Sequence, residues 1–157
     1  MSKRSIQDWF NLYGESHQNR TNKLIHWVCV PAIYFCVIGL LASIPPAAAP
    51  IIGAAPWAKA AVGAVLVGFY LPRSIPLMLG MAAWSWFCIW LSCYLLAHAA
   101  WPLWGICTAL FAVAWVGQFI GHGIEGRKPS FLTDLQFLLV GPAWLMGFIY
   151  RRLGIPY

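Results

Sequence analysis

Four long apolar runs, separated by proline-rich or polar breaks, constrain this chain more than any other feature of its sequence. They cover residues 24–43, 56–71, 76–97 and 103–121. Only 9% of the 157 residues are charged, whereas a soluble domain carries roughly 25% charged residues. A helix needs about 20 apolar residues to cross a bilayer. The sequence therefore predicts an all-α integral membrane bundle of four transmembrane helices, folded as a single domain over residues 1–157.

Both ends of the chain are expected to add a helix that does not span. Residues 1–23 alternate charges with apolar residues at near-helical spacing, which predicts an N-terminal amphipathic helix at the membrane interface. The stretch 131–150 is apolar but is interrupted by Asp134, Gln136 and a Gly-Pro pair. We expect an interfacial or re-entrant C-terminal helix there rather than a fifth span.

The net charge of +6 comes from basic residues at the ends of the apolar runs. In a soluble protein such a charge would suggest nucleic acid, but here the positive-inside rule explains it, and we expect no nucleic-acid partner. This rule places the N-terminus and the basic tail on the cytoplasmic side. The first 23 residues lack the pattern of a removable signal peptide, so we expect a multi-pass protein of a bacterial inner membrane.

A small-residue pattern lies in the fourth apolar run. Gly117 and Gly121 form a G-x-x-x-G sequence, which permits close approach of two helices. The pattern is common in apolar helices, so it gives only one candidate surface for a homo-oligomer.

Polar residues first gather where the chain enters the first predicted span. On a continuous helix Glu15, Asn19, Asn22 and His26 would share one face, because they are separated by four, three and four residues. His17 would lie to the side, so a bend or loop is needed to bring it to His26.

A second polar cluster lies where the chain leaves the fourth predicted span. Gln118, His122 and Glu125 stack at positions i, i+4 and i+7 of a helix. In a bundle with an even number of hairpin-connected spans, the start of the first and the end of the fourth lie on the same side of the membrane. The sequence therefore predicts that His17, His26 and His122 converge.

Three imidazoles form a suitable shell for a divalent transition metal, since neutral imidazole suits iron or zinc. The amide and carboxylate groups of Asn19, Asn22, Gln118 and Glu125 can orient the ring N–H groups. His98 is excluded because it lies at the far end of the third span, about 30 Å away. A single histidine at a membrane interface is often only a polar tip on an apolar body, so the prediction depends on all three coming together.

Both clusters are similar to sequence motifs of a known family. Residues 13–31 read YGESHQNRTNKLIHWVCVP, similar to H-x-N-x-x-N-x-x-x-H followed by a proline, and residues 115–129 read WVGQFIGHGIEGRKP, similar to W-x-x-Q-F-x-G-H followed by an acidic and a basic-Pro element. On these motifs the chain resembles the small multi-pass 2-hydroxy fatty acid dioxygenases typified by the yeast enzyme of phytosphingosine breakdown. The resemblance runs from Trp9 to Gly154. The matching positions are His17, Asn19, Asn22, His26, Pro31, Trp115, Gln118, His122, Glu125 and Pro129.

This resemblance implies an iron(II)-dependent dioxygenase that shortens a 2-hydroxy fatty acid by its carboxyl carbon, with O₂ as co-substrate. The residues permit such a reaction: our hypothesis is that His17, His26 and His122 hold the iron, and that Arg127 or Lys128 attracts the carboxylate of the membrane lipid or fatty acid substrate. The acyl chain is expected to lie among the spans.

One spacing departs from the resemblance. Glu125 follows His122 by three residues, whereas the eukaryotic pattern has one residue more, so no direct ligand role for Glu125 is implied. Two other function classes remain open. One is another histidine-ligated lipid oxidase or hydroxylase, although the chain has none of the H-x-x-x-H or H-x-x-H-H boxes of the diiron enzymes. The other is a non-catalytic membrane scaffold or small transport protein.

Overall fold

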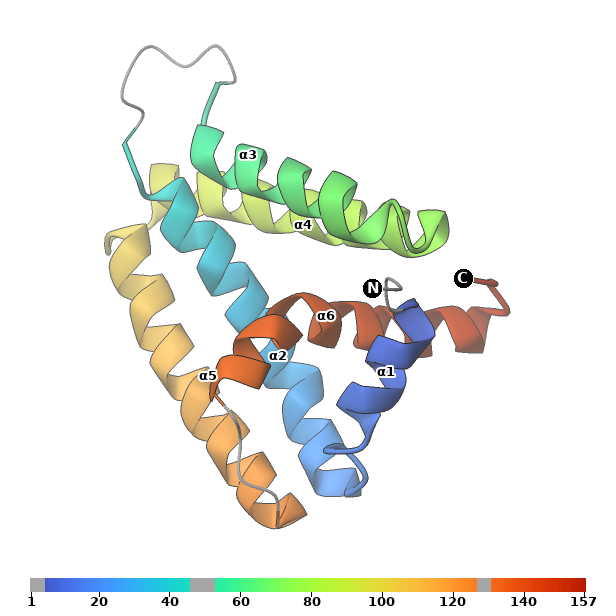
Figure 1. Cartoon of the computed structure of the whole chain (residues 1–157). Coiled ribbons are helices and arrows are strands. Elements are labelled where there is room, and N and C mark those ends of the chain that lie inside the picture. Colours follow the sequence, from blue (N-terminus) through green and yellow to red (C-terminus); the bar gives the residue numbers. More distant parts are fainter. Residues whose placement is uncertain (1–4, 46–52, 127–130) are drawn as a thin grey trace.

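The secondary structure is entirely helical in the residues that the computed structural model describes, which are 5–45, 53–126 and 131–157, without the side chains of 131–136 (Figure 1). This confirms the all-α class. The elements, in chain order, are α1 (Ile6–Gly14), α2 (Arg20–Ala42), α3 (Pro56–Val65), the π-helical turn η1 (Leu66–Tyr70), α4 (Ile75–His98), α5 (Leu103–Glu125) and α6 (Phe131–Leu153).

Three helices in the described part of the chain, α2, α4 and α5, are long and apolar enough to cross a membrane. The chain therefore has the helices of an integral membrane protein, but the prediction of four spans is wrong. The second predicted span is the ten-residue α3 followed by the five residues of η1. Fifteen residues at about 1.5 Å each extend roughly 22 Å, which is shorter than the hydrocarbon core of about 30 Å.

The single helix predicted over residues 1–23 is also wrong, because the chain turns between α1 and α2. Ser5 begins α1 and forms a capping box with Asp8, in which each side chain binds the other's main-chain N–H. Asn19 then begins α2, and its side chain accepts hydrogen bonds from the first turn of that helix. Glu15 and Asn19 consequently do not continue the helix face of His26. The interfacial positions of α1 and α6 stay predictions.

Helix α2 lies at the centre of the fold and contacts α3, α4, α5 and α6. The segment formed by α3 and η1 packs against α4 as a helical hairpin. Because the hairpin returns the chain, α5 begins near the C-terminal end of α2 (Figure 1). Helix α5 then runs back along α2. Because of this return, the end of α5 lies beside the start of α2, where α1 and α6 also meet.

Two glycines of α5 allow its close approach to α2. A Cβ atom at Gly117 would lie 2.7 Å from Cys29 Sγ, and one at Gly121 would overlap the side chain of Asn22. The G-x-x-x-G pattern therefore packs two helices of the same chain. A homo-oligomer through Gly117 and Gly121 stays a prediction, and the faces it would use are in contact with α2.

Candidate metal centre

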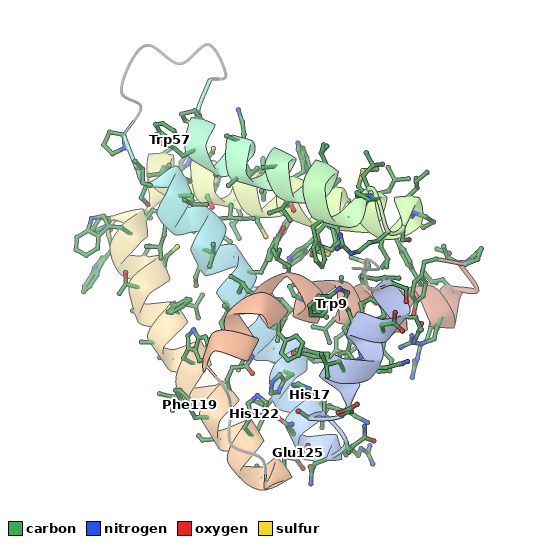
Figure 2. All side chains as sticks on the ribbon, viewed as in Figure 1. Trp9, His17, Trp57, Phe119, His122 and Glu125 are labelled. Atoms are coloured by element: carbon green, nitrogen blue, oxygen red, sulfur yellow. The ribbon has the colours of Figure 1, made fainter. Side chains whose placement is uncertain are left out.

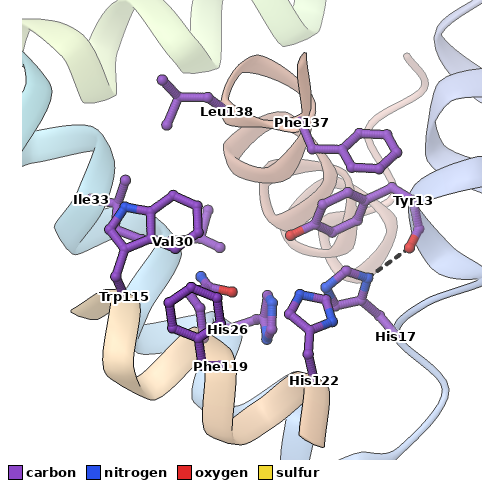
Figure 3. A pocket seen from close by; sticks show the side chains of 11 residues that line it. Tyr13, His17, His26, Val30, Ile33, Trp115, Phe119, His122, Phe137 and Leu138 are labelled. Atoms are coloured by element: carbon purple, nitrogen blue, oxygen red, sulfur yellow. Dashed lines mark hydrogen bonds between the residues drawn. The ribbon is translucent and has the colours of Figure 1, made fainter. Parts of the chain in front are cut away.

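Three buried histidines from three segments converge where α2 begins and α5 ends (Figures 2 and 3). His17 lies in the turn between α1 and α2, His26 in α2 and His122 in α5. Each offers one ring nitrogen such that all three nitrogens lie within 4.8 Å of one another. Their side chains are 2%, 1% and 6% exposed, so water has little access to them. The bend that the sequence required for His17 is the turn at residues 15–19.

Main-chain carbonyl groups orient two of the three rings. Nδ1 of His17 lies 2.6 Å from the Tyr13 oxygen, and Nδ1 of His26 lies 2.9 Å from the Asn22 oxygen. A carbonyl oxygen only accepts hydrogen bonds, so each Nδ1 carries the proton and each Nε2 keeps a lone pair. Nε2 of His17 is buried and has no hydrogen-bond partner among the described residues. A metal ion would supply the missing partner, since burying such an atom unpaired is costly.

Burial also fixes the charge of the His17 ring. It lowers the pKa of His17 from 6.5 to about 4, against the opposing effect of the hydrogen bond to Tyr13. The ring also stacks on Tyr13, with 4.0 Å between the ring centroids. His17 is therefore neutral at neutral pH, which is the form that binds metals.

The carboxylate of Glu125 ties the end of α5 to the turn that carries His17. Its Oε1 accepts a hydrogen bond from the main-chain N–H of Gln18 at 2.7 Å. Its Oε2 accepts from the N–H of Asn19 and from the Asn22 side chain, both at 2.9 Å. We call these contacts the Glu125 bridge. Both oxygens are used within the bridge, so Glu125 positions the turn rather than joining the group of three histidines.

Asn22 connects the Glu125 bridge to the histidines. Its side chain is fully buried and its Nδ2 also donates to the Ser16 carbonyl oxygen at 3.1 Å. The main-chain carbonyl oxygen of Asn22 orients His26. The side chain of Asn19 caps the start of α2, so its effect on the histidines is through the position of that helix.

The remaining predicted site residues are distributed differently. Gln118 is buried and lines the cavity beside the histidines. His98 is exposed at the end of α4, where it stacks on Tyr94, and it is not part of the histidine group. Arg127 and Lys128 lie outside the described residues.

A mainly apolar cavity of about 50 Å³ opens from the histidines, and we call it the metal-side cavity (Figure 3). It has room for several water-sized molecules, since one needs roughly 10–15 Å³. Its wall away from the histidines is formed by α2, α5 and α6. The apolar and aromatic side chains that line it are Tyr13, Val30, Ile33, Trp115, Phe119, Phe137 and Leu138.

A second, more polar cavity of about 410 Å³ also contains His17 in its wall. Lys23 and Arg151 line it, so two cations lie near a candidate ligand. Neither residue was among the site residues predicted from the sequence. Lys23 lies between Asn22 and His26 in the first polar cluster, so its place near the site could have been predicted from the sequence. The proximity of Arg151 results from the packing of α6 and could not.

Replacing Glu125 with glutamine tests the Glu125 bridge. An amide has one acceptor oxygen, and its NH₂ group would face a main-chain N–H, so the turn carrying His17 should loosen. We expect metal affinity to fall about 10- to 100-fold, as for other groups that orient ligands. Titration calorimetry with iron(II) in the absence of O₂ measures this. Glu15→Gln changes an exposed carboxylate and is the matched control. Equal affinities of the two variants would contradict the assignment.

Residues 3–153 match the family model described as 2-hydroxy-palmitic acid dioxygenase Mpo1-like. No curated protein and no solved structure matches the chain. The matched region includes all three histidines and the Glu125 bridge. Because the family model covers nearly the whole chain, the protein belongs to the 2-hydroxy-palmitic acid dioxygenase Mpo1-like family.

Proposed function

We propose that the protein is an iron(II)-dependent dioxygenase that shortens 2-hydroxy fatty acids by one carbon. The observation that carries the proposal is the convergence of three buried histidine rings. In His17 and His26 the Nδ1 atom is hydrogen-bonded to a main-chain oxygen, which leaves the lone pair of Nε2 for a metal ion. The family description supports the reaction class. The three helices that are long and apolar enough to cross a membrane support a lipid as the substrate class.

The donor set fits iron(II). His17, His26 and His122 would hold the ion through neutral imidazole, which suits iron, and three protein ligands leave positions for substrate and O₂. Bound iron(II) would supply the one-electron chemistry that allows O₂ to react with an organic substrate. Zinc also binds imidazole but has no redox chemistry, so the reaction class favours iron.

The residues around the histidines have separate tasks. The main-chain carbonyl groups of Tyr13 and Asn22 orient two of the rings, and burial shields all three rings from bulk water. Gln118 lies in the cavity wall, where its amide is suited to contact the substrate hydroxyl group. For the substrate carboxylate we propose attraction by Arg127 or Lys128. Lys23 and Arg151, which line the polar cavity that also contains His17, are two further cations suited to this attraction.

The overall reaction balances without another reductant. Breaking the C1–C2 bond of a 2-hydroxy acid with one O₂ gives the acid shortened by one carbon, CO₂ and water. The substrate carbons supply all four electrons that O₂ accepts. O₂ use should therefore be equimolar with product, and no nicotinamide or flavin donor should be required.

Two other function classes predict different results. A histidine-ligated hydroxylase or desaturase leaves the carbon number unchanged and needs an external electron donor. A scaffold or small transport protein needs neither metal nor O₂. The positive charges near the chain ends support our further proposal that the protein lies in a bacterial inner membrane with its site on the cytoplasmic side.

Purified protein in detergent, loaded with iron(II), tests the proposal directly. We expect it to convert 2-hydroxypalmitate to pentadecanoate, observed by mass spectrometry, with equimolar O₂ uptake measured by an oxygen electrode. The reaction should stop under argon and in metal-free protein. Conversion without O₂, or a product that keeps all its carbons, would reject the proposed reaction.

A further inference from the structure

A second apolar cavity, of about 70 Å³, lies between α2, α3 and α6. It is distinct from the metal-side cavity, and we call it the distal cavity. Aliphatic side chains dominate its wall. Its hydroxyl-bearing residue, Tyr34, has its OH 2.7 Å from Ser85 Oγ, so that polar group is already paired. The chemistry of this wall suits a saturated hydrocarbon and offers no polar recognition.

The two cavities are adjacent. Leu138 of α6 lines both of them, so one side chain forms their shared wall. Figure 3 shows Leu138 at the end of the metal-side cavity that is remote from the histidines. Leu138 therefore lies between the two spaces, and its side chain has several staggered rotamers.

One face of α2 runs along both cavities. His26, Val30 and Ile33 line the metal-side cavity, and Tyr34 and Leu41 line the distal cavity. Their separations are those of a single helix face. From His26 to Leu41 this face extends fifteen residues, roughly 22 Å along the helix. This length is similar to that of an extended palmitoyl chain.

From these observations we propose that the distal cavity binds the end of the substrate's acyl chain. The proposal rests on the proposed function. The chain would begin at the histidines, pass Leu138 along α2, and end against Ala61 and Val62 of α3. In this arrangement α3, which is too short to span the membrane, determines the longest chain that the site accepts.

Enlarging a residue at the end of the cavity tests this assignment. Ala61→Phe should lower kcat/KM for 2-hydroxypalmitate at least about tenfold relative to kcat/KM for 2-hydroxydecanoate. Tenfold is about the smallest discrimination that a steric mismatch in an apolar pocket produces. Turnover of 2-hydroxydecanoate should change less than about twofold. Ala64→Phe places the same ring on the exposed side of α3 and is the matched control. An equal loss for both chain lengths, or no change in the ratio, would overturn the proposal.

Photo-crosslinking provides a readout that does not depend on turnover. Metal-free protein is illuminated with 2-hydroxypalmitate carrying a diazirine at its last carbon, and adducts are mapped by mass spectrometry. We expect adducts on α3 and at Leu138, their loss in Ala61→Phe, and competition by unlabelled 2-hydroxypalmitate but not by added phosphatidylcholine. Competition by phosphatidylcholine alone would assign the cavity to a membrane lipid and overturn the proposal. Adducts confined to exposed residues of α5, such as Val113 and Val116, would also overturn it.

The two measurements separate this proposal from the proposed function. If wild-type protein turns over no 2-hydroxy acid of any length but gives the expected adducts, the dioxygenase function fails and the acyl site stands. If wild-type protein is active but Ala61→Phe does not alter the chain-length ratio, the dioxygenase stands and the acyl site fails.

Discussion

Replacing His26 with alanine is expected to remove the bound metal and to abolish turnover. The ring is almost fully buried, and its Nδ1 is hydrogen-bonded to the Asn22 carbonyl oxygen, so the substitution removes a ligand nitrogen that the fold holds in a fixed orientation. We expect metal content to fall from one ion per chain to near zero. The loss of activity should exceed about 100-fold, the upper range for residues that only orient a ligand. His17→Ala and His122→Ala should give the same result.

The control for this experiment is also a histidine. His98→Ala changes an exposed ring at the end of α4, outside the histidine group, and should leave metal content and turnover unchanged. Metal content is measured by mass spectrometry of gel-filtered protein, and helix content by circular dichroism. If His26→Ala retains helix content and a full complement of metal, the assigned metal centre is wrong.

Adding one methyl group at Gly121 is expected to have the second largest effect. The new Cβ would overlap the side chain of Asn22 and would lie 3.4 Å from His26 Cε1. Either α5 moves away from α2, or Asn22 moves and takes His26 out of position. Overpacking of this kind costs about 1–3 kcal/mol. Gly121→Ala should therefore unfold at lower denaturant concentration than wild type and bind iron(II) more weakly.

Gly123→Ala separates this steric effect from a general effect of alanine. The same helix contains Gly123, and a Cβ atom there would meet nothing within 4 Å. Its unfolding free energy should be unchanged or slightly raised, since alanine favours helix over glycine by up to about 1 kcal/mol. If both variants have the same stability and iron affinity, the close contact of α5 with the metal centre is not the reason that position 121 needs glycine.

The sequence predicted the meeting of the three histidines by an argument that was partly wrong. It relied on four spans, whereas the segment 56–71 forms a short helix and a π-helical turn. Hydropathy cannot distinguish such a pair from a short span, because both are continuous apolar runs. The convergence is nevertheless found, because α3, η1 and α4 form a hairpin that returns the chain to the same end of α2.

The turn that places His17 was partly visible in the sequence. A Ser-His-Gln-Asn stretch before an apolar run is a recognisable helix start, and Asn19 does cap α2. The role of Glu125 was not visible in the same way. Two of its three donors are main-chain N–H groups of Gln18 and Asn19, and a main-chain donor has no side-chain signature in a sequence. Only the folded chain reveals that pairing.

The Glu125 bridge also has a consequence for the biosynthesis of the protein. Asn19 and Glu125, which it joins, are 106 positions apart in the chain. At a synthesis rate of about 5–20 residues per second, Glu125 leaves the ribosome roughly 5–20 s after Asn19. During that interval His17 and His26 have been made but His122 and the carboxylate that fixes their turn have not. A metal ion held by all three histidines would therefore be bound only after α5 has docked on α2.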